Sequence, residues 1–189
     1  RMIRASIIAL SLLLASCSSV LTATRDTPIE DNHGTRTFGS TIDDQLIETK
    51  VAVNVNKADT AIESEGRIVA TSYNGVVLLA GQVPRGDLIA RAGEAAKQVQ
   101  RVKVVHNELT AGPRLSLLAR NQDGLITANL KTRLLTDGTI PGSRIKVVTE
   151  AGVVYLMGLV TNHEADLAVQ QAQQIGGVQR IVKLFEYLD

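Results

Sequence analysis

Cys17 is the only cysteine in this 189-residue chain, and its surroundings carry the clearest chemical signal. A lone cysteine has no partner for a disulfide within the chain, so its neighbours have to explain it. It follows an apolar run over residues 7–14 and the small residues Ala15 and Ser16. Small side chains let the backbone enter a peptidase site, and a thiolate can become a thioether to a lipid. Cys17 is therefore the first candidate for chemical modification in this chain.

The segment Leu14-Ala15-Ser16-Cys17 resembles the lipobox of bacterial lipoproteins. The resemblance implies a signal peptide over residues 1–16 and a covalent diacylglycerol and N-acyl lipid on Cys17. The apolar run is shorter than the roughly 20 residues that span a bilayer, so it fits a signal peptide better than a transmembrane helix. Ser18 stands where an inner-membrane retention signal often has Asp. We therefore expect a lipid-anchored protein at the outer membrane, facing the periplasm.

Composition excludes several other kinds of function. The formal net charge is +1, aromatic residues make up 3% of the chain, and there is no tryptophan. Nucleic-acid binding, which needs a basic patch or stacking rings, is poorly supported. The histidines His33, His106 and His163 share no metal-ligand spacing with one another or with Cys17. We expect no metal site, no catalytic residues and no enzyme activity.

From residue 41 the sequence repeats itself. Three blocks recur in the same order, which pairs residues 74–83 with 151–160, 42–51 with 125–134, and 101–106 with 177–182. Such agreement in three separate blocks indicates a duplicated structural unit. The predicted organisation is a tether over residues 17–40, a first domain over 41–111, a linker over 112–122 and a second domain over 123–189.

Each copy is predicted to fold in the order helix, strand, strand, helix, strand. In the second copy we expect helices at about 125–135 and 162–175, and strands at 145–149, 153–158 and 178–185. An Asn-Gly pair at Asn74 and Gly75 is typical of a tight hairpin turn. The fold class is therefore α+β, with two helices packed on one face of a three-stranded mixed sheet in each domain.

The repeated hairpin strands at Gly75–Val83 and Gly152–Val160 follow the pattern Gly-apolar-apolar-x-Leu-x-Gly-x-Val, and Gly177 opens a Gly-Val-x-x-Val-like strand. These features resemble the BON domain, although Arg101 replaces the last glycine in the first copy. Two BON domains behind a lipobox resemble a dual-domain type of outer-membrane lipoprotein. That resemblance implies a non-enzymatic phospholipid-binding protein that supports envelope integrity, with the first helix of the second domain meeting anionic lipid.

The first predicted helix of the second copy independently suits a membrane surface. Its buried side is formed by Ile126, Leu130 and Leu134. Its opposite side is apolar at both ends, so methyl groups can enter the acyl boundary while flanking cations meet phosphate. We expect phosphatidylglycerol or cardiolipin to contact Leu125, Ala128, Lys131, Thr132, Arg133, Leu135 and Arg120.

The corresponding helix of the first copy is predicted to be more polar on its outer side. Aligned block by block, this side consists of Ile42, Gln45, Thr49 and Ala52, and the helix carries Asp43, Asp44 and Glu48 against Lys50. This difference in polarity and charge favours the second domain over the first as the one that contacts lipid.

Two alternatives remain open at this stage. The side of the second-copy helix that carries Leu125 and Leu135 could pack against the first domain, which would leave the flanking cations as an ordinary solvated face. The same surface could instead dock a protein partner, making the chain an adaptor for envelope or division-site assembly factors. A hydrolase would need a deep pocket with convergent polar groups.

Overall fold

The computed structural model describes residues 37–189, which belong to one compact unit. Cys17, its lipobox, His33 and most of the predicted tether lie outside the described residues, so signal-peptide cleavage and lipid attachment remain predictions. Within the described part of the chain, no helix combines the length and apolar character needed to cross a bilayer.

The first domain contains a three-stranded sheet with β2 in the middle. Strands β1 and β2 are antiparallel, whereas β2 and β3 are parallel, so the sheet is mixed. Its elements are α3 (Phe38–Lys57), α4 (Thr60–Glu65), β1 (Arg67–Tyr73), β2 (Val76–Val83), α5 (Asp87–Lys97) and β3 (Val104–Ala111). The short helix α4 is an addition to the predicted order.

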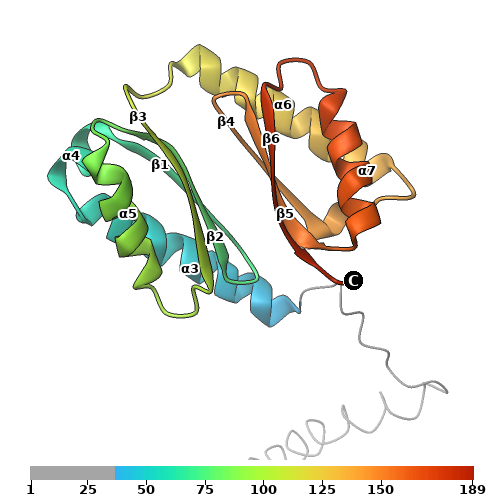
Figure 1. Cartoon of the computed structure of the whole chain (residues 1–189), viewed down its shortest axis with the longest axis horizontal. Helices are drawn as coiled ribbons and strands as arrows, with labels where there is room; N and C mark the ends of the chain where they lie inside the picture. Colours follow the sequence, from blue (N-terminus) through green and yellow to red (C-terminus); the bar gives the residue numbers. More distant parts are fainter. Residues whose placement is uncertain (1–36) are drawn as a thin grey trace, which may run out of the picture. The chain divides into compact units, whose positions relative to one another are not determined.

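The second domain repeats this arrangement, with β5 between an antiparallel β4 and a parallel β6. Its elements are α6 (Leu117–Thr136), the 3-10 turn η1 (Gly142–Arg144), β4 (Ile145–Glu150), β5 (Val153–Val160), α7 (Asn162–Gln173) and β6 (Arg180–Tyr187). In both domains the two long helices cover the same face of their sheet (Figure 1). The predicted α+β fold, with its two tandem αββαβ units, is confirmed.

Each hairpin turn places two consecutive residues in the left-handed region of the backbone. The φ angles are +53° at Asn74 and +80° at Gly75, and +53° at Ala151 and +73° at Gly152. Positive φ at both central residues defines the turn that matches the twist of two antiparallel strands. The predicted Asn-Gly hairpin signal is therefore confirmed in the first domain, and Ala151 accepts the same conformation in the second.

Each domain has its own apolar core between its helices and its sheet. Aliphatic side chains fill both cores, with Val51, Val55 and Leu79 fully buried in the first and Leu130 and Leu156 fully buried in the second. A third cluster joins the opposite, helix-free faces of the two sheets, and its buried members are Tyr73, Val76, Leu78, Ala80, Tyr155, Met157 and Leu184. The domains therefore pack against each other through their sheets.

Helix α6 begins about two turns earlier than the sequence predicted. It starts at Leu117, within the stretch 112–122 predicted as a linker, instead of near residue 125. The Ser116 hydroxyl caps this end by accepting a hydrogen bond from the Ala119 N–H at 3.2 Å. The apolar periodicity missed this start because Leu117 and Leu118 point outward and do not belong to the buried face. Helix α3 likewise begins at Phe38, inside the predicted tether, behind the cap Thr37.

Candidate functional site

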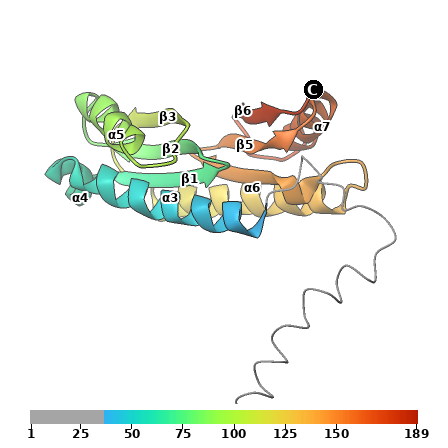
Figure 2. The ribbon, with the colours of Figure 1, turned by 90° about the horizontal axis from the view of Figure 1, so that it is seen from below.

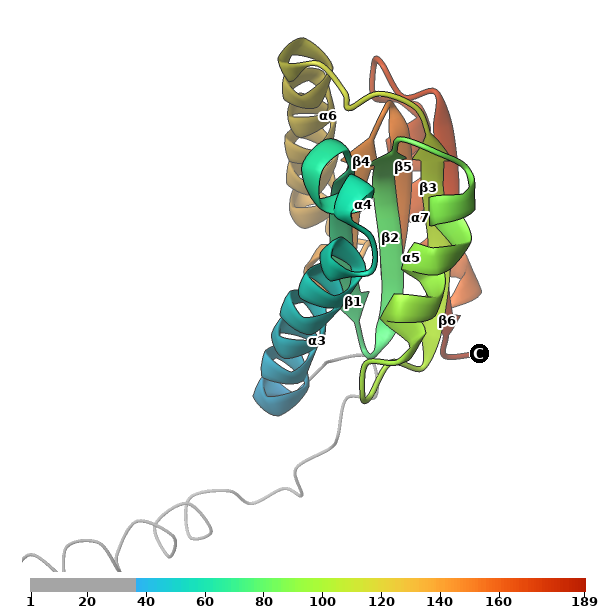
Figure 3. The ribbon, with the colours of Figure 1, turned by 90° about the vertical axis from the view of Figure 1, so that its left-hand side faces the viewer.

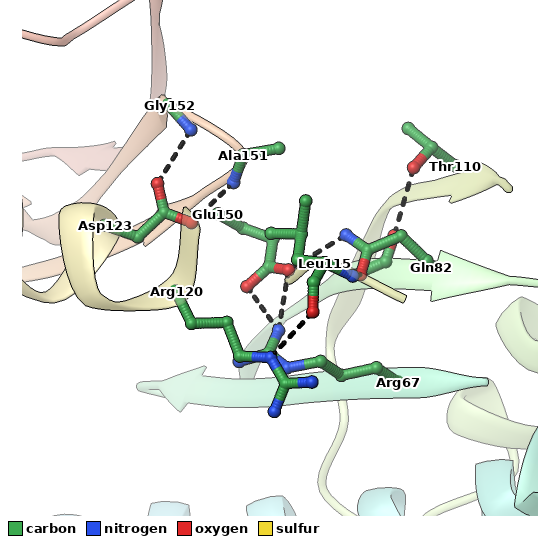
Figure 4. A network of polar contacts seen from close by, with 10 residues as sticks. Arg67, Gln82, Thr110, Leu115, Arg120, Asp123, Glu150, Ala151 and Gly152 are labelled. Carbon is green, nitrogen blue, oxygen red and sulfur yellow. Dashed lines mark hydrogen bonds and ion pairs between the residues drawn. The ribbon is translucent and has the colours of Figure 1, made fainter. Parts of the chain in front are cut away.

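A buried carboxylate fixes the rotation of α6. Both oxygens of Asp123 accept hydrogen bonds at 2.8 Å, from the backbone N–H groups of Ala151 and Gly152 in the turn between β4 and β5 (Figure 4). Ile126 and Leu130 continue the same helix side into the core. Because this side is committed inward, the opposite side of α6 faces outward.

The outward side of α6 carries the apolar residues predicted from the sequence. Leu125 is 65% exposed and Leu135 is 63% exposed, and Ala128 and Thr132 are also exposed. The alternative in which this side packs against the first domain therefore does not hold in the structure.

The earlier helix start adds two leucines that the sequence analysis missed. Leu117 is 73% exposed and Leu118 is 69% exposed, and helical geometry places both on the same side as Leu125. The signal that could have revealed them is Ser116, a favourable N-cap residue immediately before a Leu-Leu pair. We define the α6 ridge as Leu117, Leu118, Leu125, Ala128, Thr132 and Leu135.

Cations flank the α6 ridge. Lys131 and Arg133 are exposed, and Arg120 is half-buried. Arg133 donates to the Gln174 side-chain oxygen at 2.9 Å, and Arg120 donates through Nε to the Leu115 carbonyl at 3.0 Å. Among the ion pairs of residues 37–189, none uses these three cations, so their charges are available to an anion.

Arg120 and Lys131 also line a hollow of about 400 Å³ beside α6. Its lining also includes Arg67, Glu150 and Asp123, and the Arg67 guanidinium lies 2.6 Å from both Glu150 carboxylate oxygens (Figure 4). Arg67 is therefore already neutralised, which leaves Arg120 and Lys131 as the cations of this hollow that carry no ion pair among residues 37–189.

Polar contacts also tie the two domains together beside the apolar junction. Glu150 on β4 is 5% exposed and accepts from Arg67 of β1 and, at 2.9 Å, from the side-chain amide of Gln82 on β2. Gln82 in turn accepts from the Leu115 N–H at 3.1 Å, just before α6 begins. Lys146 on β4 forms an ion pair with Glu48 of α3. The Leu115 contact holds the segment just before α6 against β2, and the other contacts connect β4 to the first domain.

Two titratable groups near these features have shifted pKa values. Hydrogen bonds donated by Thr139 lower the pKa of Asp137, the residue that caps the C-terminal end of α6. Asp137 therefore remains ionised at neutral pH. Burial in the junction raises the pKa of Tyr155, which keeps its phenol protonated at neutral pH.

The structure corrects the predicted alignment between the first helices of the two copies. Asp44 accepts from the N–H groups of Asn74 at 2.8 Å and Gly75 at 2.9 Å, as Asp123 does from the equivalent turn. Asp44 therefore corresponds to Asp123, and the predicted pairing of Ile42 with Leu125 is wrong by one helical turn. Apolar spacing alone could not detect this shift, because a move of one turn keeps the same helix side buried.

With the corrected alignment, the prediction of a more polar outer side in the first domain is wrong as well. Helix α3 exposes Phe38 (82%), Ile42 (46%), Leu46 (52%) and Val53 (55%). We call these four residues the α3 ridge. The first domain therefore has an exposed apolar helix side of its own, comparable to the α6 ridge.

Within residues 37–189, no group of three or more His, Cys, Asp or Glu side chains gathers in a way that could hold a metal ion. The sequence-based expectation that the chain has no metal site or catalytic residues stays a prediction.

Comparison with known proteins identifies the class of this fold. The BON domain model matches residues 43–113 and 122–189, so both halves of the described chain are covered. The chain belongs to the BON-domain family and carries two copies of its domain.

Its relatives include the outer membrane lipoprotein DolP of Haemophilus influenzae, which is 43% identical over 154 residues, or 82% of this chain and 79% of that protein. A 21 kDa hemolysin of Actinobacillus pleuropneumoniae is 33% identical over 81% of this chain and 78% of its own length. The osmotically-inducible protein Y of Escherichia coli is 27% identical over 76% of this chain and 72% of its own length. The first of these relationships confirms the predicted outer-membrane location and supports a role in the bacterial envelope.

Proposed function

We propose that this protein binds anionic phospholipid, phosphatidylglycerol or cardiolipin, through the α6 ridge of its second BON domain and thereby supports envelope integrity. The observation that carries the proposal is the exposure of Leu117, Leu118, Leu125 and Leu135 along one side of α6. A single exposed leucine is ordinary on a protein surface, whereas four along one side of the same helix favour a site of interaction.

The chemistry of the α6 ridge matches the boundary between headgroups and acyl chains. Leucine side chains gain about 25 cal/mol for each Å² of apolar area that leaves water, and they can enter this boundary without opening the fold. Arg120, Lys131 and Arg133 lie beside the ridge, where each cation near an anionic surface contributes about 1 kcal/mol. Arg120 and Lys131 share a hollow that can accept a phosphate group.

A lipid anchor would keep the α6 ridge close to its target. In this proposal a diacylglycerol and an N-acyl chain on Cys17 hold the protein at the membrane. Residues 18–37 can reach at most about 70 Å when fully extended. Confining the domains to that distance raises the effective concentration of the ridge at the bilayer, so weak and reversible contacts suffice.

The decisive experiment measures co-sedimentation with vesicles. The chain from residue 18 onward contains both complete cores and avoids acylation. We expect it to bind vesicles of phosphatidylcholine with phosphatidylglycerol or cardiolipin, and to bind vesicles of phosphatidylcholine alone at least tenfold more weakly. The double substitution Leu125→Asp and Leu135→Asp should weaken binding to the anionic vesicles by at least tenfold, because it places negative charge where leucine meets acyl chains.

Leu188→Asp serves as the matched control, since Leu188 is exposed but lies outside α6. It should bind like the unmodified chain. Equal binding to neutral and anionic vesicles, or full binding by the α6 double variant, would contradict the proposal. Photo-crosslinking from residue 125 in cells distinguishes lipid binding from the alternative function as a protein adaptor. An adaptor for envelope assembly factors would yield a protein adduct instead of a lipid adduct.

A further inference from the structure

The α3 ridge is a second exposed apolar surface with no assigned partner. Its members Phe38, Ile42, Leu46 and Val53 recur at helical spacing, so they form one stripe along the outside of the helix. The inner side of α3 is committed to the core of the first domain through Ile47, Val51 and Val55. The exposed stripe is therefore not required for folding of that core.

The charges of α3 favour an anionic partner. Its three acids are all engaged: Asp44 binds the β1–β2 turn, Asp43 pairs with Arg101, and Glu48 pairs with Lys146. Lys50, by contrast, is exposed and takes part in no ion pair among residues 37–189. The acids that seemed to oppose lipid contact in the sequence are thus satisfied by cations or backbone donors, while Lys50 remains beside the stripe.

The α3 ridge and the α6 ridge are also placed for simultaneous contact. Helix α3 packs on β1 and helix α6 packs on β4. Lys146 of β4 reaches both Glu48 of α3 and, at 3.2 Å, the Ser72 carbonyl of β1, so the two helix–strand pairs are linked directly. In two perpendicular views α3 and α6 run along the same side of the described residues (Figures 2 and 3).

We propose that α3 forms a second contact with the anionic bilayer, so that both BON domains rest on the same membrane surface. This inference rests on the proposed function of the α6 ridge and extends it to a defined orientation. A bilayer suits both ridges better than a compact partner, because one flat, negatively charged surface can meet two apolar stripes on the same side of the described residues, together with the cations beside them. Cys17, where lipid attachment is predicted, also lies only 21 residues before Phe38 in the sequence.

Vesicle binding tests the inference through the double substitution Leu46→Asp and Val53→Asp in the chain from residue 18. We expect about tenfold weaker binding to phosphatidylglycerol vesicles, a similar loss for Leu125→Asp with Leu135→Asp, and a larger loss when all four changes are combined. Leu188→Asp again serves as the control. Circular dichroism should show that the α3 variant keeps the helix content of the unmodified chain.

A fluorescent probe gives an independent measurement that requires no disruptive charge. The chain from residue 18 contains no cysteine, so Leu46→Cys can carry a single environment-sensitive dye. Its emission should shift to shorter wavelength on phosphatidylglycerol vesicles, as it should for Leu125→Cys.

The possible outcomes separate the two proposals. If the α3 variant binds like the unmodified chain and the dye at position 46 does not respond, while the α6 variant fails to bind, the second contact is overturned and the proposed function stands. If neither variant affects binding, both proposals are overturned. If the α3 variant reduces self-association in analytical ultracentrifugation without changing vesicle binding, the α3 ridge docks a second copy and the inference is wrong.

Discussion

At the scale of single residues, Asp44 and Asp123 determine which side of each first helix faces outward. Each is almost fully buried, and each accepts hydrogen bonds from consecutive backbone N–H groups of the hairpin turn in its own domain. A carboxylate that accepts several hydrogen bonds tolerates burial that would otherwise be costly. The exposed ridges are thus a consequence of these inward contacts as well as of the apolar cores.

Replacing Asp123 with alanine should destabilise the protein by about 2 kcal/mol, because the buried N–H of Gly152 and the part-buried N–H of Ala151 lose their acceptor. Chemical denaturation followed by circular dichroism measures the change. Asp166→Ala is the matched control, since Asp166 is exposed on α7, and it should alter the free energy of unfolding by less than about 0.5 kcal/mol. Equal effects of the two changes would show that Asp123 does not anchor α6.

The sequence could predict the turn residues but not these carboxylates. Asn74 and Gly75 form a local signal whose conformation follows from the two residues themselves. The partners of Asp123, Ala151 and Gly152, lie 28 and 29 residues further along the chain. A contact over this separation leaves no pattern in the local sequence from which it could be predicted. The absence of such a pattern also explains why the predicted alignment of the two first helices was wrong by one turn.

Among the individual elements, α6 is a regular helix whose surface contains one glycine that lowers its stability. Gly124 lies in the middle of α6, and a Cβ added there would meet nothing within 4 Å. Glycine inside a helix costs stability, because the unfolded chain has more freedom to lose. The helix persists because its inner side is packed against the core. The apolar periodicity of the sequence therefore predicted the core residues of α6 well and its ends poorly.

Gly124→Ala should therefore stabilise the protein by about 1 kcal/mol and raise its melting temperature by about 2–4 °C. Differential scanning calorimetry provides the measurement. Gly152→Ala is the contrasting control: with φ at +73° and the Gln179 side chain 3.0 Å from the added Cβ, it should lower stability by about 1–2 kcal/mol. A loss of stability in the Gly124 variant would mean that this segment is not an ordinary helix interior.

At the scale of the whole described unit, the junction between the two sheets decides whether α3 and α6 keep a fixed relationship. Tyr73 and Leu78 from one sheet meet Tyr155 and Met157 from the other, and Glu150 connects β4 to β1 and β2. The duplication was evident from repeated blocks, whereas this packing was not, because both faces of each central strand are apolar and periodicity cannot tell which partner covers them.

Glu150→Ala should destabilise the protein by about 2–3 kcal/mol, because Arg67 and Gln82 lose a buried acceptor. Glu108→Ala is the comparison, because it removes a solvent-accessible ion pair: the Arg180 side chain that Glu108 contacts is 60% exposed. This change should lower the free energy of unfolding by less than about 1 kcal/mol. Urea denaturation compares the two variants. If Glu150→Ala were as mild as Glu108→Ala, the polar junction would not hold the domains together.

The central claim is that the outer side of α6 enters the headgroup region of an anionic bilayer. The most direct measurement places an environment-sensitive dye at Leu125→Cys on α6 and, in a second protein, at Asp166→Cys on α7, both positions being exposed. On phosphatidylglycerol vesicles the dye at position 125 should shift to shorter wavelength and become protected from an aqueous quencher, while the dye at position 166 stays unchanged. An unchanged, fully quenchable signal at position 125 would contradict the claim.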